Sequence, residues 1–506
     1  MQNLYKTAAV VTVFTAFEHC LGFLYRIILS RVLGSEGLGV YQVALSVFAV
    51  FITVSSSGLP ITLSRTISKH RARGNKQGVH KATTAAMLLS LAFSVPITVL
   101  LFVLRAPFSK IFSDPRCADL FYILLFSLSF TSVYAIIRGS FWGNKRFFAY
   151  SLIELIEEIV MIAMGVFLLL CFSSGIPDTN KAAIAVLISY ICSFAIAVIY
   201  FIIKGGKFRS PKGEIKPMLK SSLPVTAMRT SSSLMNSFIS VLFPMRLMAA
   251  GYTSSAALSE YGVVYGMVMP VLMIPSTIIS SIALVLVPEL SECYYKKQRE
   301  EVTRLAEKAL NSTLLIAAML IPFFIVCGAD VGILLYSSAQ SGQILQNCAL
   351  ILLPMSITMI STSLLNSMNC ERQTLIFFLL GSAAMLACVY FLPRYLGSGA
   401  LCVGMACDYC ITAICSLVLL RKKAGKLQSG KYFIKLVLAM LPVLAIGILL
   451  HSLLMRCVSY VIALVLTIFV MLVAEVLVLS LFKLMDFRAL VARFFTKKHK
   501  KSLARS

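Results

Sequence analysis

The sequence predicts an all-α polytopic membrane protein with about fourteen transmembrane helices. Three observations support this fold class. First, the 506 residues are 59% hydrophobic and only 13% charged, with a mean hydropathy of +0.90, whereas a soluble domain carries about a quarter charged residues. Second, apolar runs of about 20 residues, long enough to cross about 30 Å of hydrocarbon, recur from end to end. Third, basic residues gather in the short segments between these runs.

The apolar runs and the charged breaks between them place the spans in order. The first run carries Glu18, His19 and Arg26 and lacks a small-residue cleavage site, so it is predicted to be an uncleaved span rather than a signal peptide. The spans are expected at about residues 7–31, 38–64, 83–104, 118–142, 147–172, 182–203, 218–245, 260–288, 305–327, 344–366, 374–393, 400–420, 432–455 and 457–482.

The distribution of Lys and Arg tests this order, because these residues gather on the cytoplasmic side of membrane proteins. With the N-terminus inside, the loops assigned to the outside hold only eight of the 46 Lys and Arg residues. These eight are Arg31, Arg105, Lys110, Arg116, Lys181, Arg246, Arg394 and Arg456. A missing or extra span would reverse every later loop, so the pattern predicts a multi-pass protein with both termini in the cytoplasm.

A repeated motif predicts two lobes. Each copy reads Ser-Glu, then Val-Tyr, then a span that ends at a proline; one copy begins at Ser35 and the other at Ser259. Six spans separate the copies, so the repeat is predicted to be parallel, with two six-helix lobes and two extra C-terminal helices. The predicted organisation is a lobe over 1–204, a basic cytoplasmic linker over 205–217, a lobe over 218–421, the extra helices over 422–482, and a basic amphipathic tail over 483–506.

The composition also excludes several function classes. The net charge of +26 is spread over short loops rather than one face, so no nucleic-acid partner is predicted. The close pair Cys407 and Cys410 has no second ligand pair, so no metal site is predicted. The sequence has no phosphate-binding glycine-rich loop, no HExxH motif and no region for a soluble domain, so the chain is predicted not to be an enzyme.

Several short segments, in this order and spacing, resemble one known family. They are Leu21 to Arg26, Arg31 to Gly37, Gly58 to Pro60, Arg138 to Gly143, Ile156 to Val160, Leu223 to Ala227, and the span with Pro270, Pro275 and Pro288. Over nearly the whole chain, the sequence is similar to the stage V sporulation protein B branch of the multidrug/oligosaccharidyl-lipid/polysaccharide exporter superfamily, which is related to the lipid II flippases. The resemblance implies two lobes around a central cavity, alternating access, and a lipid-linked saccharide as cargo.

Charged residues inside the spans mark a candidate cargo site, because a charge in hydrocarbon is costly unless it is paired or faces a wet cavity. Arg229 begins a stripe of polar residues at helical spacing that includes Ser233 and Asn236, although serines also pack membrane helices closely. A guanidinium group at this depth can bind a phosphate bidentately. Glu18 and Arg26 in the first span either line the same cavity or pair with another helix. We expect Arg229 and Arg26 to hold the cargo's pyrophosphate.

A second candidate site consists of Glu154, Glu157 and Glu158, which share one helical face of the fifth span. Three clustered carboxylates cannot all ionise cheaply in a membrane, so they are predicted to form a proton or Na⁺ coupling site. The alternative is a salt-bridged interface between the lobes. Asp408 and Glu475 are lone acids in later spans, and the sequence leaves open whether they are structural or functional.

The C-terminal tail has an apolar stripe among basic residues, consisting of Phe487, Leu490, Val491, Phe494 and Phe495. It is predicted to lie on the cytoplasmic leaflet and to bind anionic lipids, the alternative being a solvated basic tail.

The sequence therefore predicts a flippase for a lipid-linked saccharide, such as a peptidoglycan precursor, in the bacterial cytoplasmic membrane. Two alternatives stay open: a cation-coupled multidrug antiporter of the same superfamily, and a non-transporting envelope assembly factor that recruits cell-wall synthases.

Overall fold

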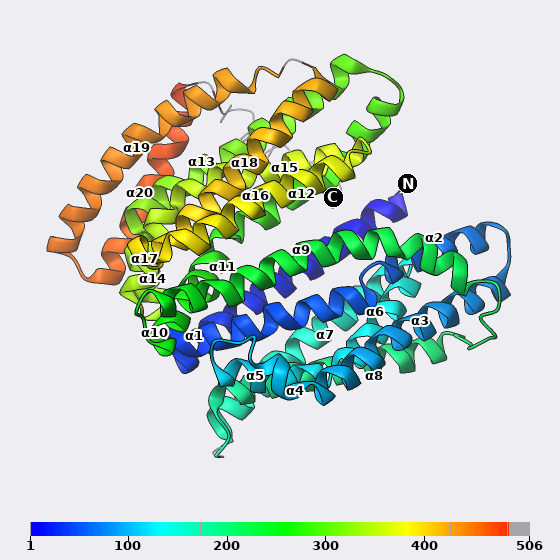
Figure 1. The fold of residues 1–506 in the computed structure, drawn as a ribbon. Helices are drawn as coiled ribbons and strands as arrows, with labels where there is room; N and C mark the ends of the chain where they lie inside the picture. Colours follow the sequence, from blue (N-terminus) through cyan, green and yellow to red (C-terminus); the bar gives the residue numbers. More distant parts are fainter. Residues whose placement is uncertain (1, 173–174, 426, 483, 485–506) are drawn as a thin grey trace, which may run out of the picture. The chain divides into compact units, whose positions relative to one another are not determined.

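The apolar runs fold as helices in the computed structural model, which describes residues 2–172, 175–425, 427–482 and 484. No β-strand occurs among these residues. The main helices in Figure 1 are α1 (Gln2–Ser56), α2 (Leu59–Ala72), α3 (Lys76–Val103), α4 (Arg105–Ser109), α5 (Pro115–Leu125), α6 (Leu128–Gly143), α7 (Phe147–Val166), α8 (Asp178–Ile203), α9 (Ile215–Ala249), α10 (Ser254–Tyr261), α11 (Met269–Leu272), α12 (Ile274–Tyr295), α13 (Arg299–Tyr336), α14 (Ala339–Cys348), α15 (Leu352–Ser367), α16 (Glu371–Phe391), α17 (Pro393–Leu396), α18 (Gly399–Ala424), α19 (Ser429–Cys457) and α20 (Tyr460–Leu481). Apart from residue 484, the predicted tail over 483–506 lies outside the described residues, so its lipid binding stays a prediction.

Gly34 divides the long helix α1 into two apolar segments. Its backbone has φ 67° and ψ −176°, which is not helical. A positive φ of this size strains any residue with a Cβ atom, and glycine adopts it readily. The break falls between the predicted spans 7–31 and 38–64; α1 contains the first of them and most of the second, whose last residues lie in α2.

The segment predicted as one span over 118–142 is a bent pair of helices. α5 and α6 meet at 50°. Between them, the Ser127 hydroxyl group donates a hydrogen bond to the carbonyl oxygen of Leu124 at 2.6 Å. Such local bonds from serine to the backbone compete with helical hydrogen bonds and bend helices. The segment predicted as a span over 118–142 is thus interrupted by a bend.

Among the described residues, eleven helices are long and apolar enough to cross a membrane, or twelve if α5 and α6 form one span. This count takes the continuous stretch from Val13 to Ala72 once, although it contains two predicted spans. α7 is absent from the count because it carries three glutamates. The all-α polytopic fold is thus confirmed, whereas the number fourteen is not.

Contacts between helices divide the chain into two units. Unit 1 comprises Met1–Pro270 and Ser382–Gly404, and unit 2 comprises Val271–Gly381 and Met405–Ser506. The core of unit 1 forms mainly where α2, α3, α6 and α8 meet, and the core of unit 2 mainly where α12, α13, α15 and α18 meet. In unit 2, α19 and α20 also pack against α13.

Helix α9, which the sequence assigns to the second lobe, packs along α1 in unit 1 (Figure 1). The two contact-based units therefore do not coincide with the predicted lobes over 1–204 and 218–421, which remain a prediction.

The two copies of the repeated motif touch each other within unit 1. The hydroxyl oxygens of Ser35 and Ser259, which are equivalent positions in the repeat, lie 2.6 Å apart. Nearby, the Gln42 side-chain amide donates a hydrogen bond to the carbonyl oxygen of Tyr265 at 3.3 Å. One pair of equivalent serines of the two motif copies therefore meets where α1 contacts α10.

Close packing at this contact leads to a stability prediction. A methyl group added at Gly262 would lie 1.9 Å from the carbonyl oxygen of Ser35. Because the obstacle is backbone, no side-chain rotation relieves it, and Gly262→Ala is expected to cost about 1–3 kcal/mol of folding free energy. Thermal melting in detergent measures the effect. Gly430→Ala is the matched control, since nothing lies within 4 Å of its added methyl group; equal melting temperatures for the two variants would refute this packing.

Candidate functional site

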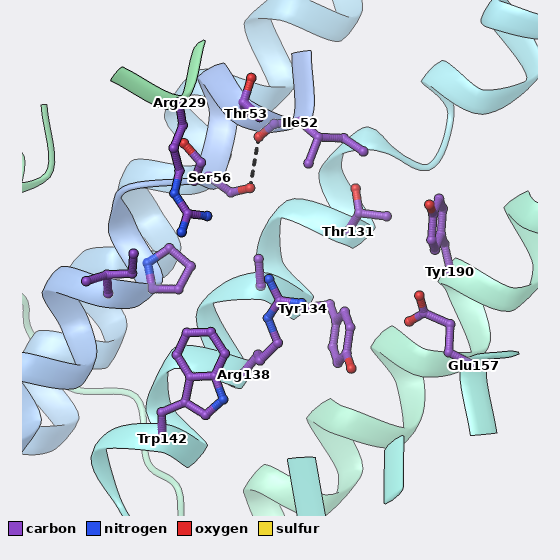
Figure 2. Close-up of a pocket in the computed structure, with 14 residues that line it drawn as sticks. Ile52, Thr53, Ser56, Thr131, Tyr134, Arg138, Trp142, Glu157, Tyr190 and Arg229 are labelled. Carbon is purple, nitrogen blue, oxygen red and sulfur yellow. Dashed lines mark hydrogen bonds between the residues drawn. The ribbon is translucent and has the colours of Figure 1, made fainter. Parts of the chain in front are cut away.

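A cavity of about 250 Å³ opens inside unit 1. Its walls come from α1, α2, α6, α7, α8 and α9, and combine charged, hydroxyl and aromatic side chains (Figure 2). The lining residues are Ile52, Thr53, Ser56, Ser57, Pro60, Ile61, Thr131, Tyr134, Ala135, Arg138, Trp142, Glu157, Tyr190 and Arg229. The largest share comes from α6, whose lining residues follow the spacing of one helical face.

The turn between α1 and α2 shapes the wall between α6 and α9. The Gly58 amide donates a hydrogen bond to the Thr226 hydroxyl group at 3.2 Å, which ties the turn to α9 one helical turn before Arg229. Pro60 stands in the first turn of α2, where its missing N–H is not needed. Gly139 of α6 lies so close that a Cβ atom there would be 2.6 Å from Pro60. The turn is therefore held between the two helices that carry arginines into the cavity.

Arg138 is the cavity residue with the clearest ion pair. Its Nη1 atom lies 2.9 Å from Oε1 of Glu154 on α7. The guanidinium carbon lies 5.4 Å from the centre of the Trp142 ring, close enough for a cation–π interaction. Nε of Arg138 is buried and has no hydrogen-bond partner among the described residues. The side chain is thus neutralised by one carboxylate while keeping unused donors.

The three glutamates of α7 reach three different surroundings. Glu154 pairs with Arg138 on α6. Glu157 lines the cavity, lies close to Ser193 of α8, and keeps one buried carboxylate oxygen, Oε2, with no partner in the described part of the chain. Glu158 lies against α1, where a Cβ atom at Gly22 would be 2.8 Å from its Oε1. Of the three, only Glu157 faces the cavity directly.

Arg229 lies on the cavity side of α9 and is exposed. Within the described residues, the structure shows no hydrogen bond or ion pair of its guanidinium group. Figure 2 shows the Arg229 and Arg138 side chains reaching into the cavity from different helices. A small polar cavity with one paired and one unpaired arginine is suited to an anionic ligand.

Comparison with known proteins shows which family this chain matches. Residues 4–294, more than half of the chain, match the family described as "Polysaccharide biosynthesis protein". The chain belongs to this family.

Two named bacterial proteins are similar to much of this polysaccharide biosynthesis protein. Stage V sporulation protein B of Bacillus subtilis (strain 168) is 24% identical over 338 residues, which cover 63% of this chain and 64% of that protein. The match therefore spans less than two thirds of that relative. Lipid II flippase MurJ of the same organism is 19% identical over 484 residues, covering 88% of this chain and 87% of that protein.

A solved structure of lipid II flippase MurJ in an inward closed conformation has the same fold. It superposes with a TM-score of 0.72 at 16% sequence identity, and the alignment covers 96% of this chain and 100% of the MurJ chain. The predicted resemblance to the exporter branch is therefore confirmed, and this polysaccharide biosynthesis protein has a multi-pass, all-α membrane fold.

The other predicted cargo residues of this family member lie outside the cavity lining. Ser233 is half-buried on α9 and Asn236 is exposed. Arg26 lies within electrostatic reach of Glu158, and Glu18 within reach of Glu154, Glu158 and Arg138. The structure thus brings Glu18 and Arg26 to the carboxylates of α7, whereas Arg229 is the predicted cargo residue that it places at the cavity.

Sequence reasoning missed Arg138, Trp142, Tyr134 and Tyr190 as cavity residues. Arg138 lies inside the predicted span 118–142, near its cytoplasmic end, and was quoted only as part of a family motif. A charged residue within an apolar span was the signal that could have identified it. The aromatic residues gave no such signal, because aromatic side chains are common in membrane helices.

The two lone acids of this polysaccharide biosynthesis protein both lie in unit 2. Asp408 of α18 packs against Gly381 and lies beside the Thr412 hydroxyl group, at 3.5 Å. Glu475 of α20 is 5% exposed, next to the core between α13, α19 and α20. Neither belongs to the cavity, so their roles stay open between structure and function.

Proposed function

We propose that this protein is a transporter, a flippase that moves a lipid-linked saccharide, such as a peptidoglycan precursor, from the inner to the outer leaflet of the bacterial cytoplasmic membrane. The observation that carries the proposal is the unpaired Arg229 in a polar, aromatic-lined cavity. A phosphate-linked sugar head group pays a large free-energy penalty in bare hydrocarbon, and a polar cavity removes most of it. The polysaccharide family and the fold shared with a lipid II flippase support the same cargo class.

In this mechanism each group of cavity residues has a separate task. Arg229 binds a phosphate of the cargo through paired hydrogen bonds. Aromatic and hydroxyl side chains such as Trp142 and Thr131 face the sugar. Glu157, with Glu154 and Glu158 close by on α7, is the proposed site of proton or Na⁺ coupling. Movement against a gradient needs such coupling or the membrane potential, which supplies about 2.3 kcal/mol per charge at 100 mV.

Lipid capture tests the cargo class. Protein purified in mild detergent is expected to retain polyprenyl diphosphate-linked saccharide, detected by mass spectrometry of the extracted lipids, because Arg229 has no protein acceptor to compete with phosphate. The Arg229→Ala variant should retain much less. Identical lipid profiles from the two proteins, with bulk phospholipid alone in both, would argue against this cargo.

We also propose that both termini lie in the cytoplasm, as the distribution of basic residues predicts. A reporter that works only in the cytoplasm should be active when it is fused to either end of the chain. The same reporter should be inactive when it is placed in the 245–260 loop. A C-terminal fusion that reports from outside the membrane would rule out this topology.

A further inference from the structure

Arg138 faces a protein acceptor and the cavity at the same time. It lies 2.9 Å from Glu154, yet 32% of its side-chain surface is exposed, twice the 16% of Glu154. Its buried Nε donor has no partner among the described residues. A buried donor without a partner is destabilising, and a ligand with acceptor oxygens would remove that cost.

The surroundings of the pair allow Arg138 to leave Glu154. Tyr150 lies one helical turn before Glu154 on α7 and close to it, so a polar side chain stays near this carboxylate when the arginine turns away. Glu157 of α7 and Glu18 of α1 are further acidic neighbours, and the Tyr134 hydroxyl group lies in the same cluster. Trp142 covers one face of the guanidinium group and stabilises its charge without using its donors.

Arg229 supplies a second guanidinium group from α9 in the same cavity (Figure 2). Each guanidinium group can form two parallel hydrogen bonds to one phosphate. Two of them on separate helices therefore match the two phosphates of a diphosphate better than a single phosphate.

Building on the proposed function, we infer that Arg138 is the second diphosphate-binding residue of the cavity, and that a cargo phosphate replaces Glu154 as its acceptor. Glu154 is then the counter-ion of the empty cavity. It neutralises Arg138 before cargo binds, and it competes with the diphosphate afterwards. This competition weakens binding and speeds release, which a carrier needs as much as affinity.

A double-mutant cycle on the full-length protein in detergent tests the exchange, with a labelled polyprenyl diphosphate as the probe. Arg138→Gln is expected to weaken binding by about tenfold or more, since charge-assisted hydrogen bonds are lost. Glu154→Gln should tighten binding several-fold because the competitor is removed, and the double variant should bind like Arg138→Gln. A structural ion pair gives another pattern, in which both single variants weaken binding and the double variant recovers it; that pattern overturns the inference.

Two matched controls accompany the cycle. Arg105 and Asp119 form an exposed ion pair of unit 1 outside the cavity, at 3.3 Å, so Arg105→Gln and Asp119→Asn should leave binding unchanged. Arg138→Lys keeps the charge and can pair with Glu154, but it should lose the preference for diphosphate over monophosphate probes. If Arg138→Lys binds both probes as the wild type does, Arg138 is not a diphosphate contact.

The probes also distinguish a lipid-linked diphosphate from a free anion. They further distinguish the inference about Arg138 from the proposed flippase function. Inorganic pyrophosphate is expected to compete only at far higher concentration than the lipid; equal potency would assign the cavity to a free anion and overturn the lipid cargo. Binding that depends on Arg229 but not on Arg138 refutes this inference alone. Absence of binding to the wild-type protein refutes the proposed function together with it.

Discussion

Replacing Arg229 with alanine is expected to lower the translocation rate per folded molecule by about 100-fold, because the cargo loses two charge-assisted hydrogen bonds at one phosphate. Arg229→Lys should fail nearly as badly. An ammonium group carries the charge but cannot form two parallel hydrogen bonds. The measurement is the initial rate of lipid-linked saccharide flipping in liposomes, divided by the amount of monodisperse protein.

Lys220→Ala is the matched control for Arg229, because Lys220 is an exposed cation on the same helix and does not line the cavity. It should flip at the wild-type rate. If Arg229 instead served as a structural partner for the acids of α7, lysine would largely rescue both protein level and activity. Full activity of Arg229→Lys would therefore refute the phosphate clamp.

The second large effect is expected at the carboxylates of α7. The double variant Glu157→Gln with Glu158→Gln should lose the dependence of transport on an ion gradient while remaining folded. Glu157→Gln alone should account for most of this loss, because Glu157 lines the cavity and keeps an oxygen without a partner in the described part of the chain. Gln has nearly the same shape as Glu but cannot take up a proton or balance a cation.

The assay for coupling compares flipping with and without an imposed proton gradient, Na⁺ gradient or membrane potential. Glu158→Gln alone is the matched control, since Glu158 lies against Gly22 of α1 rather than in the cavity lining. Wild-type gradient dependence in the double variant would remove Glu157 and Glu158 from the coupling mechanism.

The sequence predicted the membrane class, the order of the helices and the exporter branch, because hydropathy and loop charge act over whole segments. It also placed a break between residues 31 and 38, where Gly34 leaves the helical conformation. The bend at Ser127 was not predictable, since it depends on one hydroxyl group choosing a backbone acceptor within an apolar run.

At the site, the sequence identified Arg229 and Glu157 but not the role of their neighbours. Helical spacing puts Glu154, Glu157 and Glu158 on one face, yet that face meets three different helices. The packing of α6, α8 and α1 around α7 decides which of these acids contacts Arg138, which lines the cavity and which lies against Gly22. Tertiary packing of this kind leaves no signature in the spacing of residues along a single helix. For the same reason, the sequence predicted the depth of Arg26 in the membrane but not the residues that surround it.

The central claim, that this protein flips a lipid-linked saccharide, is tested most directly by reconstituting the purified wild-type chain in liposomes with a labelled lipid-linked saccharide in one leaflet. We expect the label to reach the opposite leaflet at a rate that rises with the number of protein molecules per vesicle, and far more slowly with Arg229→Ala. Equal rates for wild-type, Arg229→Ala and protein-free vesicles, with the proteins shown to be folded, would contradict the flippase and favour a non-transporting role in envelope assembly.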